Sequence, residues 1–169
     1  MKLKKLLVRA IAVLAVTAAS VASAQSDDKI LTVTGRIGRT NTPDHKGYVF
    51  TFAELKKLGD AHITSTTRYV GTAHFDGPRI RDILRAVKAD PQATEVAVVA
   101  LDGYQKVIPI SDFKTWDVIT AHTQDGKRLT VETKGPLWIM YPNDQHPGEL
   151  LNNETTTKLV WSLTGLVVK

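Results

Sequence analysis

The sequence contains no cysteine, and this absence excludes a disulfide framework, a zinc–thiolate site and a cysteine nucleophile. Long apolar runs are missing as well. The one candidate, residues 11–21, is interrupted by Thr and Ser and is shorter than the roughly 20 residues that span a bilayer. Glycine-rich phosphate loops of the Rossmann or P-loop kind are also absent, so we expect no nucleotide cofactor held in that way.

Residues 1–24 have the features of a secretory signal peptide. Four Lys and Arg precede the apolar stretch 11–21, and Ala22-Ser23-Ala24 supplies the small residues for cleavage after Ala24. A retained membrane anchor is the alternative. We therefore expect a periplasmic protein whose mature part, residues 25–169, is one domain large enough to bury its own core.

The apparent basicity of the chain comes from this N-terminal segment. The sequence has 22 Lys and Arg against 17 Asp and Glu. Residues 1–24 hold four of the basic residues and none of the acidic ones, so 18 basic residues remain against 17 acidic ones. The mature chain therefore lacks the electrostatic footprint of a protein that binds nucleic acid.

The pattern of apolar residues predicts several strands and a few short helices. Thr51 and Glu54 have the spacing of a capping box, which predicts a helix over residues 52–58. Residues 62–77 read as a strand, and a second helix should start near Asp76-Gly77-Pro78. The buried face of this second helix should consist of Ile80, Ile83, Leu84 and Val87. Alternating patterns and two Asp-Gly turns predict further strands at 30–36, 94–101, 104–110, 118–122, 127–132, 136–141 and 158–168. A short helical piece is expected at 111–116. The fold class is α+β, with a mixed or antiparallel sheet and two or three short helices.

The usual signs of catalysis are weak in this sequence. None of the five histidines has the spacing of a metal-ligand motif, and we interpret His62 and His122, in strand patterns, as structural. Ser65 lies in no G-x-S-x-G motif and has no base close to it in the sequence. We therefore predict neither catalytic nor metal-binding residues, although a triad assembled in space stays an open alternative.

A row of hydroxyl-bearing residues and a set of aromatic ones are the candidates for ligand binding. They would suit a flat heteroaromatic ligand that needs stacking surfaces and hydrogen bonds along its edge. Trp161 belongs to the same aromatic set, but it lies in an apolar strand pattern, so a core role is the alternative for it. The candidate ligand-binding residues are Ser65, Thr66, Thr67, Arg68, Tyr69, Asp102, Tyr104, Trp138 and Tyr141.

Five motifs in the same order give the chain a resemblance to a known family. They are FAELKKL at 52–58, STTRY with HFDGPRIRDIL at 65–84, ALDGY with VIPISDF at 100–113, GPLWIMYP at 135–142, and WSLTGLVV at 161–168. Together they resemble the oxidoreductase molybdopterin-binding domain, the sulfite-oxidase fold, from about Leu31 to Val168. The small exported single-domain members are the most similar.

The resemblance implies a cofactor site from which the metal ligand is missing. Catalytic members hold molybdenum through one cysteine thiolate, and the corresponding position falls at or near Ser65. A hydroxyl stays protonated at neutral pH and is a poor substitute for that soft ligand. Trp138 also stands where such enzymes commonly carry an Arg for the cofactor phosphate. We expect no cysteine-ligated molybdenum.

The function implied by this resemblance is binding of a pterin or molybdopterin-type ligand in the periplasm, without catalysis. Similar small members act as regulators that dock on the periplasmic domain of an inner-membrane cyclic-di-GMP enzyme, which gives the expected kind of partner. One alternative is a molybdenum-cofactor-dependent oxidoreductase, or its subunit, that works without a cysteine ligand. The other is an interaction module with an occluded site.

Overall fold

The structure, a computed structural model, describes residues 29–169. The signal peptide predicted at residues 1–24 lies outside the described residues. Three sheets and a set of short helices give the α+β architecture that the sequence predicts. Between residues 29 and 169, none of the helices has the length and apolar character needed to cross a membrane.

The largest sheet is mixed and has five strands. Their order is β2 (Gly47–Thr51), β1 (Lys29–Gly35), β11 (Leu163–Val168), β5 (Glu95–Ala100) and β6 (Gln105–Pro109). Strands β1 and β11 run parallel, whereas all other neighbours are antiparallel. The alternation expected of a strand is visible in β1, where Leu31 and Val33 are buried and Thr32 and Thr34 are partly exposed.

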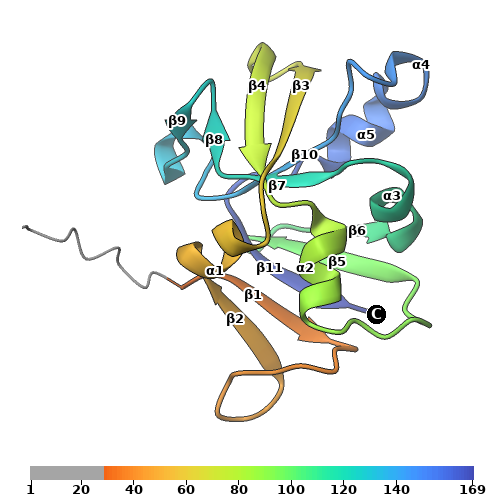
Figure 1. The fold of residues 1–169 in the computed structure, drawn as a ribbon. Coiled ribbons are helices and arrows are strands. Elements are labelled where there is room, and N and C mark those ends of the chain that lie inside the picture. Colours follow the sequence, from red (N-terminus) through yellow and green to blue (C-terminus); the bar gives the residue numbers. More distant parts are fainter. Residues whose placement is uncertain (1–28) are drawn as a thin grey trace, which may run out of the picture.

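Two smaller sheets lie on one side of the large sheet. One is antiparallel, with the order β3 (Ala61–Thr67), β4 (Gly71–Gly77), β8 (Thr123–Gln124) and β9 (Lys127–Arg128). The other pairs β10 (Trp138–Met140) with β7 (Ile119–Ala121). Figure 1 shows the β3–β4 hairpin standing above the large sheet, with β7 and β10 between them.

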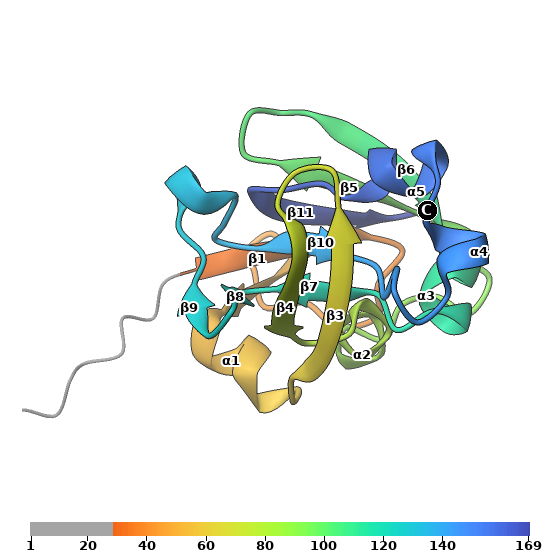
Figure 2. The same cartoon turned by 90° about the horizontal axis from the view of Figure 1, so that it is seen from above.

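Short helices fill the space around the sheets. They are α1 (Phe52–Lys57), α2 (Ile80–Ala86), α3 (Ile110–Thr115), the 3-10 helix η1 (Val131–Thr133), α4 (Pro147–Leu150) and α5 (Asn153–Lys158). The capping box of Thr51 and Glu54 is formed as predicted. The predicted buried face of α2 is also confirmed, since Ile80, Ile83 and Leu84 lie in the core together with Val87 just beyond the helix. In Figure 2, α4 and α5 lie on the same side of the molecule as α3.

The sequence predicted two or three helices, and α4 and α5 were missed. With four and six residues, they are too short to show an apolar period. Local hydrogen bonds define α5 instead: the Asn152 side chain caps its first turn by accepting from the Thr155 N–H at 2.8 Å.

The prediction of a single strand over residues 62–77 was wrong, because this segment folds back as the β3–β4 hairpin. Arg68, Tyr69 and Val70 form the turn, and the Thr67 Oγ1 atom accepts from the N–H groups of Tyr69 and Val70 at 3.3 Å each. Gly71 then takes a φ of +68°, which few other residues adopt readily. The segment carries no Asn-Gly or Asp-Gly pair that would have marked the turn in the sequence.

Candidate functional site

The β3–β4 turn places Arg68 and Tyr69 on opposite sides of one chain reversal. The Arg68 side chain is exposed, and its Nη2 atom donates to Asn153 Oδ1 on α5 at 2.9 Å. The Tyr69 ring packs edge-on against Trp161, with 5.1 Å between the ring centroids. The turn therefore connects an aromatic region with a polar one.

The aromatic region contains a cavity of about 300 Å³, here called the aromatic cavity. It lies between the β3–β4 turn, the β5–β6 turn and the segment that precedes β11. The residues that line it include Tyr69, Asp102, Tyr104, Thr156, Leu159 and Trp161. Three rings and one carboxylate make it suitable for a flat ligand with hydrogen-bond donors.

A second cavity, of about 590 Å³, lies on the other side of the β3–β4 turn and is here called the polar cavity. Thr66, Thr67 and Arg68 form one wall, and residues from the loop after β10 and from α4 and α5 form the rest. Those that matter chemically are Asn143, Asn152, Asn153 and Thr156. Because Thr156 lines both cavities, the two adjoin.

Asn143 gives the polar cavity a buried acceptor. Its side chain is 3% exposed, and its Nδ2 atom donates to the Thr66 carbonyl oxygen at 3.0 Å. That bond fixes the orientation of the amide and leaves Oδ1 without a hydrogen-bond partner among residues 29–169. A buried acceptor of this kind favours a ligand that brings its own N–H or O–H group.

The β5–β6 turn positions Asp102 and Tyr104 at the aromatic cavity. Asp102 Oδ1 accepts the backbone N–H of Tyr104 at 2.9 Å, and Gly103 between them has a φ of +86°. This is an Asx-type turn, which holds the carboxylate in one orientation. The Tyr104 side chain is half exposed.

Three of the nine predicted residues line neither cavity. Ser65 is fully buried on the inner face of β3, and its Oγ has no partner within the described part of the chain. Trp138 is buried and donates through Nε1 to the Leu159 carbonyl oxygen at 3.1 Å. Tyr141 donates through its hydroxyl to Asp112 Oδ2 at 2.7 Å, and burial together with this carboxylate raises its pKa above the usual value. These side chains belong to the core in this structure.

Sequence reasoning missed several residues of the two cavities. Trp161, for which a core role was one alternative, precedes β11 and is 40% exposed, so the core alternative is excluded. Asn143, Asn152 and Asn153 were not singled out. The signal available in the sequence was the group of Asn and Gln residues between 143 and 153. Short side chains of this kind often form hydrogen bonds with backbone groups of irregular segments, which indicates a polar loop.

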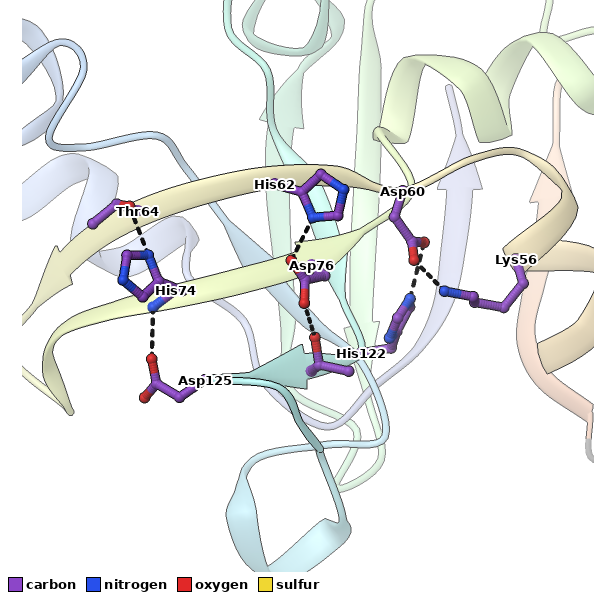
Figure 3. A network of polar contacts seen from close by, with 9 residues as sticks. Lys56, Asp60, His62, Thr64, His74, Asp76, His122 and Asp125 are labelled. Carbon is purple, nitrogen blue, oxygen red and sulfur yellow. Dashed lines mark hydrogen bonds and ion pairs between the residues drawn. The ribbon is translucent and has the colours of Figure 1, made fainter.

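The outer face of the β3–β4 hairpin carries a separate network of polar contacts, drawn in Figure 3. His62 Nδ1 lies 2.6 Å from Asp76 Oδ1, and Asp76 Oδ2 accepts from Thr123 Oγ1 at 2.6 Å. Next to them His74 Nδ1 lies 2.9 Å from Thr64 Oγ1. The Thr123 hydroxyl is the main cause of the lowered pKa of Asp76; burial opposes it and His62 adds to it.

The two histidines interpreted as structural differ in the structure. His122 is buried, and its Nε2 lies 2.9 Å from Asp60 Oδ1, so this prediction is confirmed. His62 has a structural contact as well, with Asp76 across the hairpin, but its side chain is 78% exposed, so the expected burial is wrong. Burial raises the pKa of Asp60, but the hydrogen bonds from Lys56 and His122 outweigh it and lower the pKa overall. Among residues 29–169, no group of three or more His, Asp or Glu could hold a metal ion.

Comparison with known proteins identifies the family of this domain. Residues 51–144 match the family described as the oxidoreductase molybdopterin binding domain, and the chain belongs to this family. No curated protein sequence matches the chain.

The fold is sulfite-oxidase-like. Among solved structures, the chain is similar to the sulfane dehydrogenase SoxCD from Paracoccus pantotrophus, with a TM-score of 0.64 and 14% sequence identity. The match covers 84% of this chain but only 38% of the SoxCD chain. At this identity the likeness shows the fold alone.

The residues present fit one part of molybdopterin and not the other. The metal end does not fit, since the chain has no cysteine and the buried Ser65 hydroxyl lines neither cavity. The pterin end fits better: the aromatic cavity offers ring surfaces, Arg68 offers donors, and Asn143 offers an unpaired acceptor. The donor set therefore suits an organic ring system rather than a thiolate-bound metal.

Proposed function

We propose that the protein binds a pterin-type ligand and acts without catalysis. The observation that carries this proposal is the pair of adjoining cavities, one aromatic and one polar, in a molybdopterin-binding domain without cysteine. A flat ring would pack against Tyr69, Tyr104 and Trp161. Arg68, at the neighbouring turn, would leave Asn153 and donate to acceptor atoms of the ligand.

Titration of the purified protein with pterin tests this proposal. We expect saturable binding, and about tenfold weaker binding after Arg68→Ala, because a hydrogen bond from a charged donor is lost. Arg85→Ala is the matched control, since Arg85 is an exposed arginine on α2 that pairs with Asp82. Unchanged affinity in the Arg68 variant would remove Arg68 from the site, and absence of pterin binding would overturn the proposal.

The proposal includes a periplasmic location and a partner in the inner membrane, such as a cyclic-di-GMP enzyme, that responds to the liganded state. Exposed apolar side chains near the aromatic cavity support a partner at this place: Leu101, Tyr104, Val131 and Trp161. Fractionation of cells that express the tagged protein would test the location. Binding of the partner's periplasmic domain with and without pterin would test the response.

The family favours a second candidate, a molybdenum-cofactor-dependent oxidoreductase or its subunit that holds the metal without cysteine. Metal analysis and an absorption spectrum of protein purified from its own periplasm would separate the two. Stoichiometric molybdenum would favour the enzyme. A metal-free protein that retains a fluorescent pterin would favour the binding protein.

A further inference from the structure

The two adjoining cavities carry opposite charges. Apart from tyrosine, the aromatic cavity is lined by one ionisable side chain, Asp102, and the polar cavity by one, Arg68. A ligand that extends across both would meet a carboxylate at one end and a guanidinium at the other. The end that lies among the rings should therefore be electropositive or rich in N–H donors.

Asp102 has the geometry to bind such an end. Its Oδ1 atom already accepts the Tyr104 N–H, which fixes the carboxylate against rotation. Its other oxygen, Oδ2, takes no part in this bond, and the residue is exposed. The turn itself is held by backbone bonds, including one of 2.8 Å from the Leu101 N–H to the Ser162 carbonyl oxygen beside Trp161. The carboxylate is thus positioned at the rim of the rings before any ligand arrives.

The pterin ring has one edge that matches a carboxylate. Its exocyclic amino group and the adjacent ring N–H point in the same direction, so they can donate two parallel hydrogen bonds as a guanidinium does. Lumazine has the same bicyclic ring but carries a carbonyl in place of that amino group. A carboxylate accepts from the first edge and repels the oxygen of the second.

We propose that Asp102 is the specificity-determining residue that selects aminopteridines over oxo-pteridines such as lumazine. This inference rests on the proposed function, since it names which pteridines the site takes. The ring would lie among Tyr69, Tyr104 and Trp161 with its amino edge at Asp102, and its opposite side would face Thr156 and the polar cavity.

Asp102 also has a plain structural role, because Asp-Gly is a common turn pair. The substitution Asp102→Asn separates the two roles. The Asn side chain keeps an oxygen that can accept the Tyr104 N–H, so the turn remains. It replaces the second oxygen with an NH₂ group, which removes the charge and adds a donor. Asp125→Asn, at the other Asp-Gly turn and outside both cavities, is the matched control.

The experiment titrates pterin and lumazine into the wild-type protein and both variants by calorimetry, with melting temperatures as a check of folding. We expect the wild-type protein to bind pterin about tenfold or more tightly than lumazine. In the Asp102→Asn protein the preference should fall or reverse at an unchanged melting temperature. The Asp125→Asn protein should behave as wild type.

The possible results separate the role of Asp102 from the proposed function. Equal wild-type affinity for pterin and lumazine would overturn the role of Asp102 and leave the proposed function intact. A preference for pterin that survives Asp102→Asn would have the same consequence. Absence of binding of either compound to the wild-type protein would overturn the proposed function and this inference together. The wild-type comparison needs no variant, so it can overturn the inference even if a variant fails to fold.

Discussion

Trp138 and Trp161 have different environments, and these favour a core role for the first and a ligand-binding role for the second. Trp138 is fully buried, its ring packs edge-on against Phe75 at 5.6 Å between centroids, and its N–H is satisfied by the Leu159 carbonyl oxygen. Trp161 is 40% exposed and lines the aromatic cavity. Trp138 is among the residues predicted to bind the ligand and lies in the core instead, whereas Trp161, for which a core role was one alternative, lines the cavity.

The same substitution at these two positions should therefore have different effects. Trp138→Ala leaves a cavity and an unpaired carbonyl, so we expect a loss of about 3–5 kcal/mol in the free energy of unfolding. Trp161→Ala should cost about 1 kcal/mol and weaken pterin binding, because a stacking surface is lost. Urea denaturation and pterin titration measure the two effects. Unchanged pterin affinity in a folded Trp161 variant would contradict the assignment of this ring.

At the scale of elements, one face of the β3–β4 hairpin packs into the protein interior and the other carries polar cross-strand pairs. Alternation along β3 turns Ile63, Ser65 and Thr67 inward and His62 and Thr64 outward. The outward side chains pair across the strands with those of β4, as Figure 3 shows. Cross-strand pairs of this kind stabilise a hairpin modestly, which here fixes the turn that carries Arg68 and Tyr69.

The pairing of Asp76 predicts a pH dependence of stability. The pKa of Asp76 is lower in the folded protein than its usual value, so the unfolded chain binds more protons and the contribution is present above about pH 4. It is lost as the pH falls through the folded pKa. We expect Asp76→Asn to lower the free energy of unfolding by about 1 kcal/mol at neutral pH, with the difference from wild type shrinking below about pH 4.

Urea denaturation of both proteins between neutral and acidic pH would measure this. Glu95→Gln, at an exposed carboxylate on β5, serves as the control and should show no such difference. A constant gap between wild type and the Asp76 variant at all pH values would mean that the carboxylate contributes through packing rather than charge.

Elements with a strong local signal could be predicted from the sequence, and those that depend on tertiary contacts could not. The capping box of Thr51 and Glu54 and the periodic face from Ile80 to Val87 are local features, and both helices formed there. The β3–β4 turn depends on hydrogen bonds from Thr67 and on contacts with α5 through Arg68. The Thr67 bonds are local and leave only a weak signal in the sequence, whereas the contact between Arg68 and α5 leaves none.

At the scale of the whole molecule, the candidate site is an assembly of distant segments. Tyr69, Tyr104 and Trp161 come from three separate parts of the chain. Motifs in the sequence predicted the fold. Of the nine residues predicted to bind the ligand, six line the two cavities: Thr66, Thr67, Arg68, Tyr69, Asp102 and Tyr104. The exposure of Trp161 could not be inferred from the sequence, because this residue precedes β11 and the alternation of a strand does not apply to it.

A ligand held by segments so far apart should stabilise the entire fold. Binding to the folded state alone adds about 2.7 kcal/mol when the free ligand is at 100 times its dissociation constant. We therefore expect pterin to raise the melting temperature by several degrees, and to do so with increasing concentration. Arg68→Ala should need about tenfold more pterin for the same shift. A melting temperature that does not respond to high pterin concentrations would show that pterin does not bind preferentially to the folded protein.

The central place of β11 also bears on how the chain folds. Residues 163–168 form the strand that lies between β1 and β5 in the five-stranded sheet. The pairs β1–β2 and β5–β6 join strands that are neighbours in the sequence, whereas β11 pairs with strands that lie far before it in the chain. The two local pairs can therefore become one sheet only when residues 163–168 pair with both, and such non-local pairing slows folding.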